Sequence, residues 1–561
     1  MKRRLKYLFC LIVLFSLSRS SLLYGQELSS GVWYLHEGQY QTAKSLFIKA
    51  IRKDPDNAKA YYYLGDVYDK MMLRDSAEHS FTEGMERNSL EPLNYAGLGR
   101  ISYYKRMNTQ AFEYFEKGRK LSKNDLNYLS EVVKITLSEE IRDLSSAQKY
   151  LAIIESSGDE NPDYYILRGD MKYLTLSFGE AANEYQRAIY YNKNCIPAYI
   201  RLGKLYLKAK SYSDASNAFN NAIRIDSNQI DVYKCYGELN YNFGKYRDAK
   251  RYFEIYLSRS EYNSDDQEQY AYILFFSGEY EKANEIVDTL LQINPDSPVL
   301  YRLKAYMSYE LGQYEKGLES IESLCTIEPP DKLIASDYLY KGRLLIKNGQ
   351  DSAGVRDLII AYQMDRTKSE LIPEIAQKFT KLKNHPAAIE WYQTGFKAGI
   401  ENERNSYYNI GKEYYMWAQD LVQVTDSVER VNLLRNADTS FTQVTEVSPN
   451  NFTGYLLRGR VRSQLDPDQI QGLAAPDYEK ALVLIREGDT VKNQKYLQEC
   501  YKYLSYYYYT VGEKAFSKDQ EAAKESFKKS LLYLQSLQSA DANDEQIIAT
   551  IEYLEEVLRK K

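Results

Sequence analysis

Apolar residues recur along the chain at helical spacing, in pairs of segments that together repeat about every 34 residues. The first segment of each pair carries a tyrosine, then a leucine three residues later and a glycine directly after it, as in Tyr61, Leu64 and Gly65. Spacings of three and four place side chains on one face of a helix. The pattern therefore predicts pairs of amphipathic helices over most of the chain.

The second segment of each pair repeats an alanine, an aromatic residue four positions later and usually a small residue three positions beyond it. The clearest copies are Ala43-x3-Phe47-x2-Ala50, Ala77-x3-Phe81-x2-Gly84, Ala111-x3-Phe115-x2-Gly118, Ala181-x3-Tyr185-x2-Ala188 and Ala215-x3-Phe219-x2-Ala222. Two helices approach closely only where no large side chain intervenes. We therefore expect the aromatic residue to fill the space beside a close helix contact.

The eighth position of each repeat should be that close contact, because it is small in all but one of fourteen copies. These residues are Gly31, Gly65, Gly99, Val133, Gly169, Gly203, Gly237, Ala271, Ala305, Gly342, Ala376, Gly411, Gly459 and Ser505. The period and the small and aromatic positions together resemble the tetratricopeptide repeat (TPR) family. The resemblance implies an all-α fold, a TPR-type α-solenoid built as a right-handed superhelix of antiparallel helix hairpins, with a C-terminal capping helix.

The repeat spacing predicts two sections. Residues 26–403 form a TPR array of about eleven units, in which the unit at 126–161 is degenerate because Val133 replaces the glycine. Residues 404–561 form TPR-like units with lengthened helices, since Leu421, Val424 and Val428 keep helical spacing through an insertion. An apolar stripe that includes Ile551 and Leu554 predicts the capping helix.

Residues 1–25 are predicted to be a signal peptide. Basic residues precede an apolar run, 7–15, that is too short to span a bilayer, and small residues follow it. Two cleavage regions remain open, after Ser20 or after Gly25, and retention as an N-terminal anchor is the alternative. The signal predicts an exported, periplasmic protein, with no integral span in the mature chain and a place in an envelope-associated complex.

Amino-acid composition excludes some classes of function for this chain, such as general nucleic-acid binding. With 44% hydrophobic and 27% charged residues the chain folds in water, and its 56 tyrosines are unusual. The net charge is −5, and residues 1–25 hold five basic groups and no acidic one, so a mildly acidic body is expected that does not bind nucleic acid. The four cysteines outside residues 1–25 are Cys195, Cys235, Cys325 and Cys500. Their spacing is that of neither a zinc site nor a redox pair, so they should be small core residues.

We expect no catalytic, metal or cofactor site, and therefore no enzyme. The three histidines, His36, His79 and His385, lack metal-ligand spacing and are expected on the surface or in loops. No nucleophile elbow or phosphate-binding loop is present, and Asp466-Pro467-Asp468 is typical of a turn.

Positions 9 and 12 of each repeat face away from the helix stack, and in the TPR family this stripe lines the concave groove. The predicted partner-binding residues combine aromatic anchors with basic groups that set the register: Tyr103, Tyr173, Tyr241, Phe275, Tyr309, Tyr415, Arg100, Lys204, Arg343 and Lys412. The sequence thus favours a non-catalytic scaffold or adaptor for protein partners in an envelope assembly. Two alternatives stay open: capture of a glycan or another envelope polymer, and an accessory role in a catalytic complex.

Overall fold

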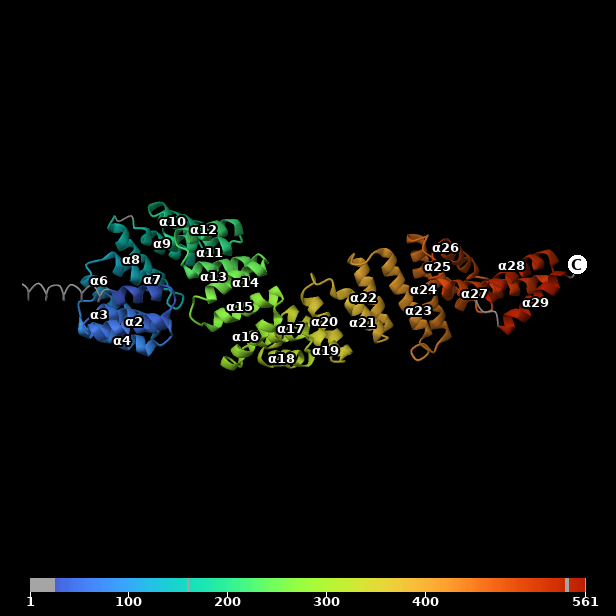
Figure 1. Ribbon diagram of the computed structural model, residues 1–561, viewed down its shortest axis with the longest axis horizontal. Coiled ribbons are helices and arrows are strands. Elements are labelled where there is room, and N and C mark those ends of the chain that lie inside the picture. The colour runs from blue at the N-terminus through green and yellow to red at the C-terminus, as the bar shows by residue number, and fades with distance from the viewer. Residues whose placement is uncertain (1–25, 159–160, 540–543, 560–561) are drawn as a thin grey trace, which may run out of the picture. The chain divides into compact units, whose positions relative to one another are not determined.

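The computed structural model describes residues 26–158, 161–539 and 544–559, and the described chain contains helices and no strand. The predicted signal peptide lies outside these residues. Helices follow one another as antiparallel neighbours (Figure 1), starting with a helical segment at 26–36 that pairs with the next helix. The all-helical array of TPR-like hairpins is therefore confirmed.

The chain divides into two compact units, with the boundary between Pro295 and Asp296. The division predicted at residue 404 follows repeat spacing instead and stays a prediction. The helices of the first unit after residue 36 are α2 (Tyr40–Lys53), α3 (Ala58–Lys70), α4 (Arg74–Arg87), α5 (Pro92–Tyr104), α6 (Asn108–Leu121), α7 (Leu126–Leu137), α8 (Leu144–Ser156), α9 (Pro162–Leu174), α10 (Phe178–Tyr191), α11 (Ile196–Lys208), α12 (Tyr212–Ile225), α13 (Ile230–Asn242), α14 (Tyr246–Leu257), α15 (Ser264–Ser277) and α16 (Tyr280–Ile293).

The second unit continues the same alternation with longer helices toward its end. Its helices are α17 (Pro298–Glu310), α18 (Tyr314–Ile327), the short 3-10 helix η1 (Pro330–Lys332), α19 (Ala335–Lys347), α20 (Asp351–Met364), α21 (Leu371–Lys381), α22 (His385–Lys397), α23 (Glu403–Gln419), α24 (Ser427–Val447), α25 (Phe452–Leu465), α26 (Ala475–Glu487), α27 (Gln494–Phe516), α28 (Gln520–Gln538) and α29 (Glu545–Arg559). Ile551 and Leu554 of α29 are buried, as the predicted cap requires.

The glycine and aromatic positions meet as the sequence predicts. A Cβ built on Gly169 would lie 2.5 Å from the Tyr185 ring, and one on Gly31 would lie 2.5 Å from Phe47. The aromatic side chain occupies the volume that the glycine leaves, and Phe47, Phe81, Phe115 and Phe219 are all fully buried. This pair joins the first and second helices of a hairpin.

The insertion after residue 416 differs from the prediction of continuous helix. Helix α23 ends at Gln419 and α24 begins at Ser427, with turns and irregular backbone between them. Val424 is buried, whereas Leu421 and Val428 are 69% and 65% exposed. Helical spacing alone did not decide the structure, because only one of these three side chains packs into a core. The lengthening of α24, α27 and α28 is as expected, at 21, 23 and 19 residues.

His385 also departs from the prediction of a surface or loop residue. It begins α22, is 2% exposed, and its Nδ1 lies 2.8 Å from the Glu413 carboxylate of α23. The buried polar group has found a partner on the next hairpin, which the sequence spacing of 28 residues did not suggest. His36 and His79 are exposed as expected. Cys195, Cys235 and Cys500 are buried as predicted, whereas Cys325 is only half-buried and departs from the prediction of a core residue.

Asp466 confirms the predicted turn after α25. Its carboxylate accepts backbone hydrogen bonds from Ile470, Gln471 and Gly472 at 2.8, 3.0 and 2.7 Å. Local capture of backbone amides by an aspartate is the usual way to close such a turn.

Candidate interaction surface

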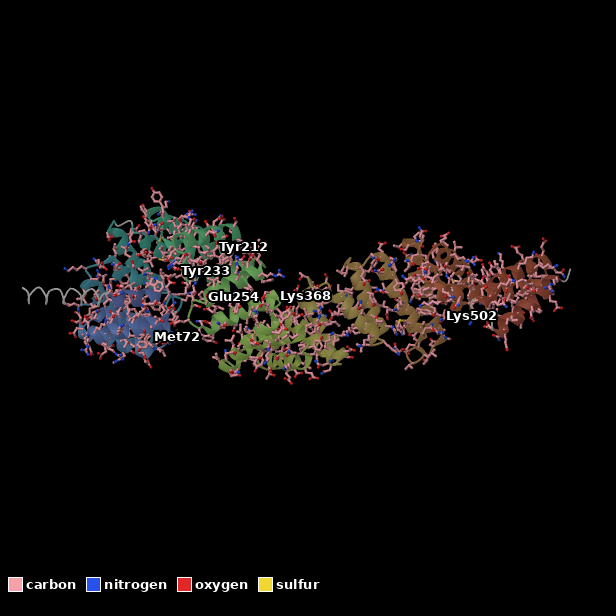
Figure 2. The ribbon with its side chains drawn as sticks, viewed as in Figure 1. Met72, Tyr212, Tyr233, Glu254, Lys368 and Lys502 are labelled. Carbon is pink, nitrogen blue, oxygen red and sulfur yellow. The ribbon has the colours of Figure 1, made fainter. Side chains whose placement is uncertain are left out.

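The predicted partner-binding residues all lie on the first helix of a hairpin. In the first unit α5 carries Arg100 and Tyr103, and α9, α11, α13 and α15 carry Tyr173, Lys204, Tyr241 and Phe275. In the second unit α17, α19 and α23 carry Tyr309, Arg343, and Lys412 with Tyr415. The structure brings each set onto equivalent helices within its unit. Side chains of many kinds project along both units (Figure 2), so contacts must separate candidate anchors from the rest.

The aromatic members of the set are partly buried and held by neighbouring helices. The Tyr103 hydroxyl donates to Asp143, and burial together with this hydrogen bond raises the pKa of Tyr103 to about 12. Tyr173 lies edge-on to Phe178, with ring centroids 5.4 Å apart, and the Lys208 ammonium lies 4.8 Å from its ring centroid. Such rings are fixed before any partner arrives, which lowers the entropic cost of binding.

The remaining aromatic residues are held in the same way. Tyr241 makes an edge contact with Phe276, with ring centroids 5.7 Å apart, and Phe275 packs on Tyr280 at 5.6 Å. Tyr309 lies edge-on to Tyr340 at 5.6 Å. In the second unit the Tyr415 hydroxyl accepts a hydrogen bond from Gln464 at 3.0 Å.

The basic members of the set differ sharply in how far they are engaged within the chain. Arg100 is 6% exposed, and its guanidinium contacts Asp66, Asp69 and Glu131 at 2.5, 2.9 and 3.1 Å. Arg343 makes a two-pronged contact with Glu374, at 2.8 and 3.3 Å. These two arginines therefore connect successive hairpins.

The two lysines of the set are exposed. No hydrogen bond or ion pair within the described residues engages the ammonium group of either Lys204 or Lys412. A charged group that is not already paired inside the chain can attract an acidic partner without first losing an ion pair. The lysines are therefore better placed than Arg100 or Arg343 to contact a partner directly.

A shallow pocket of about 250 Å³ lies along the first helices of three successive hairpins, α7, α9 and α11. Tyr173, Leu167 and Leu137 supply its apolar wall, and Lys134, Asp170 and Arg201 supply charge. Asp170 is already paired with Arg201 at 2.7 Å and accepts from the Tyr185 hydroxyl at 2.8 Å. The pocket thus offers an apolar and aromatic floor with a fixed charged rim.

A second feature of the first unit was not predicted: its beginning contacts a region some 220 residues later. The backbone amides of Gln41 and Thr42, at the start of α2, donate to the Glu261 carboxylate at 2.9 and 3.3 Å. The Gln39 side chain donates to the Arg259 carbonyl at 3.0 Å. Helix α2 has no side-chain cap and no acidic residue in its first turn. Glu261 therefore acts as a distant N-terminal cap, satisfying free amides and the positive end of the helix dipole.

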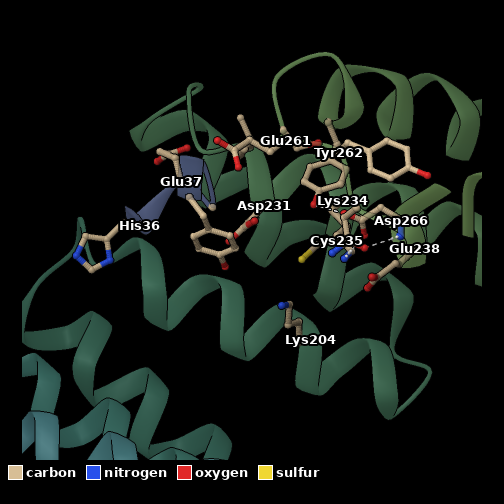
Figure 3. Close-up of a pocket in the computed structure, with 16 residues that line it drawn as sticks. His36, Glu37, Lys204, Asp231, Lys234, Cys235, Glu238, Glu261, Tyr262 and Asp266 are labelled. Atoms are coloured by element: carbon tan, nitrogen blue, oxygen red, sulfur yellow. Dashed lines mark hydrogen bonds and ion pairs between the residues drawn. The ribbon is translucent and has the colours of Figure 1, made fainter. Parts of the chain in front are cut away.

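This closure forms a pocket of about 410 Å³ (Figure 3). Three stretches of chain line it: residues 36–40, side chains of α11 and α13, and residues 256–266. Lys204 projects toward it from α11, on the side opposite Glu261 in the view. Of the residues predicted for partner binding only Lys204 belongs to this pocket. Repeat alignment could not have found it, because its walls come from units that are distant in sequence.

Three further properties concern the described residues. No group of three histidine, cysteine or acidic side chains is arranged to hold a metal ion in the described part of the chain. No helix within the described residues combines the length and apolar character needed to cross a membrane. Burial raises the pKa of the Cys235 thiol to about 12, which makes this cysteine a weak nucleophile.

Comparison with known families identifies the repeats. Residues 34–91 and 196–229 each match a tetratricopeptide repeat model, and residues 242–324 match the model of anaphase-promoting complex, cyclosome, subunit 3. These segments are therefore similar to tetratricopeptide repeats, which typically mediate protein–protein interactions. No curated protein matches the chain at a significant level.

Several solved structures are similar to parts of the chain. The C-terminal part of a TPR repeat-containing protein from Cytophaga hutchinsonii is 27% identical, covering 51% of this chain and 99% of its own, with a TM-score of 0.35. A tetratricopeptide repeat protein from Parabacteroides merdae is 20% identical, covering 45% of this chain and 98% of its own, with a TM-score of 0.32. YrrB, described as a TPR protein with an unusual peptide-binding site, is 17% identical over 33% of this chain and 94% of its own, with a TM-score of 0.28.

Proposed function

We propose that the chain is a non-catalytic scaffold in an exported, envelope-associated assembly, and that it holds segments of protein partners on the first helices of its hairpins. The observation that carries the proposal is the pocket at α7, α9 and α11, where Tyr173 and two leucines form an apolar floor. Aromatic anchors in such pockets commonly dominate the free energy of protein binding.

The rigidity of the aromatic row supports the same proposal. Tyr173 and Tyr241 of the first unit and Tyr309 of the second are each held by a neighbouring ring, so a partner segment on either unit would meet side chains that are already ordered. Tyrosine offers a flat apolar face and a hydroxyl at small cost in side-chain entropy. We assign the role of anchor to these tyrosines and the role of charged rim to Lys204 and Lys412.

Export is part of this proposal and rests on the signal-like pattern of residues 1–25. Fractionation of the native cell, followed by sequencing of the N-terminus of the recovered protein, tests it. A shortened protein outside the cytoplasm would support export. A full-length protein in the cytoplasm would contradict both export and an envelope assembly.

The scaffold function is tested by mild cross-linking and quantitative co-purification of the wild type beside a variant with Tyr173, Tyr241 and Tyr309 changed to Ala. A matched control changes the exposed Tyr190, Tyr191 and Tyr553 to Ala, and circular dichroism checks the fold of both variants. We expect a defined set of proteins with the wild type and the control, and its loss from the row variant.

Two other outcomes contradict parts of the proposal. If the same proteins remain on a folded row variant, the binding surface lies elsewhere on the chain. If no protein is enriched but a glycan titration shifts the purified wild type, the chain is a polymer-capture protein rather than a protein scaffold.

A further inference from the structure

We propose that the pocket closed by Glu261 and α2 binds one cationic side chain, lysine or arginine, of a partner polypeptide. The proposal rests on the scaffold function above and names the chemistry of one contact within it. The pocket has a volume of about 410 Å³, within the range of ligand sites in proteins. Its charges, its buried carboxylate and its aromatic walls each point to a cation.

The charges that line the pocket are unbalanced. Five carboxylates face two ammonium groups: Glu37, Asp231, Glu238, Glu261 and Asp266 against Lys204 and Lys234. Lys234 is paired with Asp266 at 2.6 Å, and Glu261 caps α2. Glu37, Asp231 and Glu238 make no ion pair with any described residue. An incoming cation would therefore find carboxylates that are not already paired with a cation of the chain.

Glu37 shows that this imbalance is not confined to the solvent-exposed rim. The residue is 7% exposed, and its carboxylate accepts a long hydrogen bond of 3.4 Å from Gln229. Burial, with Asp231 and Asp226 nearby, raises the pKa of Glu37. A buried carboxylate beside other carboxylates is stabilised in its charged form by a cation that enters the same space.

The aromatic walls suit the same ligand. Tyr40, Tyr256 and Tyr262 line the pocket. Tyr256 is already engaged, since its hydroxyl donates to Asp266 at 2.6 Å and the Lys234 ammonium lies 5.5 Å from its ring centroid, so Tyr40 and Tyr262 are the rings left for a ligand. Tyrosine rings attract ammonium and guanidinium groups through the negative potential of the ring face. Burial and, after it, the charges of Asp231, Asp66 and Glu261 raise the pKa of Tyr40, in agreement with the carboxylates that line this end of the pocket.

Lys204 allows a test of whether the ligand of the pocket is a cation or an anion. It lines the opposite side of the pocket, its ammonium is unpaired within the described residues, and it would repel a second cation. The removal of its charge should therefore tighten binding of a cation and weaken binding of an anion. An anion site would respond in the opposite way.

The test uses the full chain and capped nine-residue peptides of glycine and serine that differ only at the central residue. The central residues are arginine, citrulline as its neutral isostere, lysine, acetyl-lysine and glutamate. Titrations followed by ligand-detected NMR should give at least five-fold tighter binding for arginine over citrulline, and for lysine over acetyl-lysine. Equal binding of each charged and neutral pair, tighter binding of the glutamate peptide, or no binding up to 5 mM would overturn the proposal.

Variants locate the site. The double change Asp231→Asn and Glu238→Gln should weaken the arginine peptide about ten-fold, and Lys204→Gln should strengthen it about three-fold. The matched control, Asp75→Asn with Glu86→Gln, removes two exposed carboxylates of α4 and should leave affinity unchanged. Equal losses in the double variant and the control would show only a general charge effect and would overturn the site.

Hydrogen exchange gives a readout that is independent of affinity. The amides of Gln41 and Thr42 border the pocket through Glu261, so the arginine peptide should slow their exchange. Peptide binding without added protection there would place the cation elsewhere. The outcome can be distinguished from that of the scaffold test. If the charged peptides bind more tightly than their neutral counterparts but no protein is captured, the cation site is supported without the scaffold function. If proteins are captured but charged and neutral peptides bind equally, the scaffold function is supported and the cation site is contradicted.

Discussion

The hairpins α7–α8 and α23–α24 depart from the repeat in opposite ways. In α7–α8 the glycine of the eighth position is replaced by Val133, and Leu151 stands where other units have an aromatic residue; both are buried in one cluster. In α23–α24 the connection is lengthened, yet a Cβ built on Gly411 would lie 2.9 Å from the Phe441 ring. The glycine–aromatic contact is thus kept in α23–α24 despite the longer connection, whereas α7–α8 fills its core with Val133, Leu151 and the fully buried Tyr150.

The largest effect is expected from Phe441→Ala, which leaves a cavity that Gly411 cannot fill. Phe441 is fully buried, so the change should cost about 3–5 kcal/mol of unfolding free energy. Urea unfolding followed by the fluorescence of Trp417, which packs against the same cluster, measures it. Val422→Ala, at a side chain 90% exposed, is the control and should stay within about 0.5 kcal/mol. A similar loss in both variants would contradict a volume-determined contact.

The next effect comes from converting α7–α8 to the usual pair. Val133→Gly alone should cost about 2–3 kcal/mol through a cavity and a helical glycine, and Leu151→Phe alone about 1–3 kcal/mol through overpacking. If the two side chains compensate for one another within their shared cluster, the double change should cost at least about 1 kcal/mol less than the sum of the single changes. Hydrogen exchange of the α7 and α8 amides measures the free energy of opening in the wild type, the two single variants and the double variant. Strict additivity would show that the two positions do not compensate for one another.

A smaller effect is expected from Gly411→Ala. The added methyl group meets the Phe441 ring, which costs about 1–3 kcal/mol, while the better helix propensity of alanine returns up to about 1 kcal/mol. Gly399→Ala is not a suitable control, because Gly399 has a φ of 68° and alanine would be strained there. Gly179→Ala on α10, where a Cβ meets nothing within 4 Å, should instead be stabilising. If both Gly411→Ala and Gly179→Ala are stabilising, the close contact between Gly411 and the Phe441 ring is contradicted.

The smallest effect is a difference in pH response between the two hairpins. Burial of Glu116 on α6 opposes its ionisation, but hydrogen bonds from Arg119, Lys149 and Tyr150 outweigh burial and lower the pKa of Glu116 to about 2. Because the folded pKa lies below the unfolded value of 4.5, this stabilisation is present above pH 4.5 and is lost as the pH falls toward 2.

Glu116→Gln should therefore destabilise α7–α8 by about 1 kcal/mol at pH 6 and much less at pH 3. The exchange of the α8 amides, compared with that of α24 as an internal reference, measures this difference. An equal effect of the substitution at both pH values would contradict the role of the charged carboxylate.

Much of the fold follows from residues that are near in sequence. Gly169 and Tyr185 are 16 residues apart and repeat at a fixed period, so the sequence identifies both the hairpin and its contact. The cap helix follows from an apolar stripe on a single helix. Such features depend on local helical geometry, which amino-acid spacing encodes directly.

The insertion after α23 marks one limit of that reasoning. Leu421, Val424 and Val428 keep helical spacing, but only Val424 finds a core to enter. Spacing predicts which side chains share a face if a helix forms, whereas packing against a neighbour decides whether the helix is stable.

The repeat, the hairpins and the positions of the aromatic row were determined by the sequence alone. Only the tertiary structure paired His385 with Glu413, buried Arg100 among three carboxylates and brought Glu261 to the start of α2. The physical reason is that the Glu261 contact spans 220 residues and depends on the summed rotation of several hairpins. Each hairpin contributes a small turn that its own residues fix, but which two surfaces finally meet is settled only when all the turns are added together.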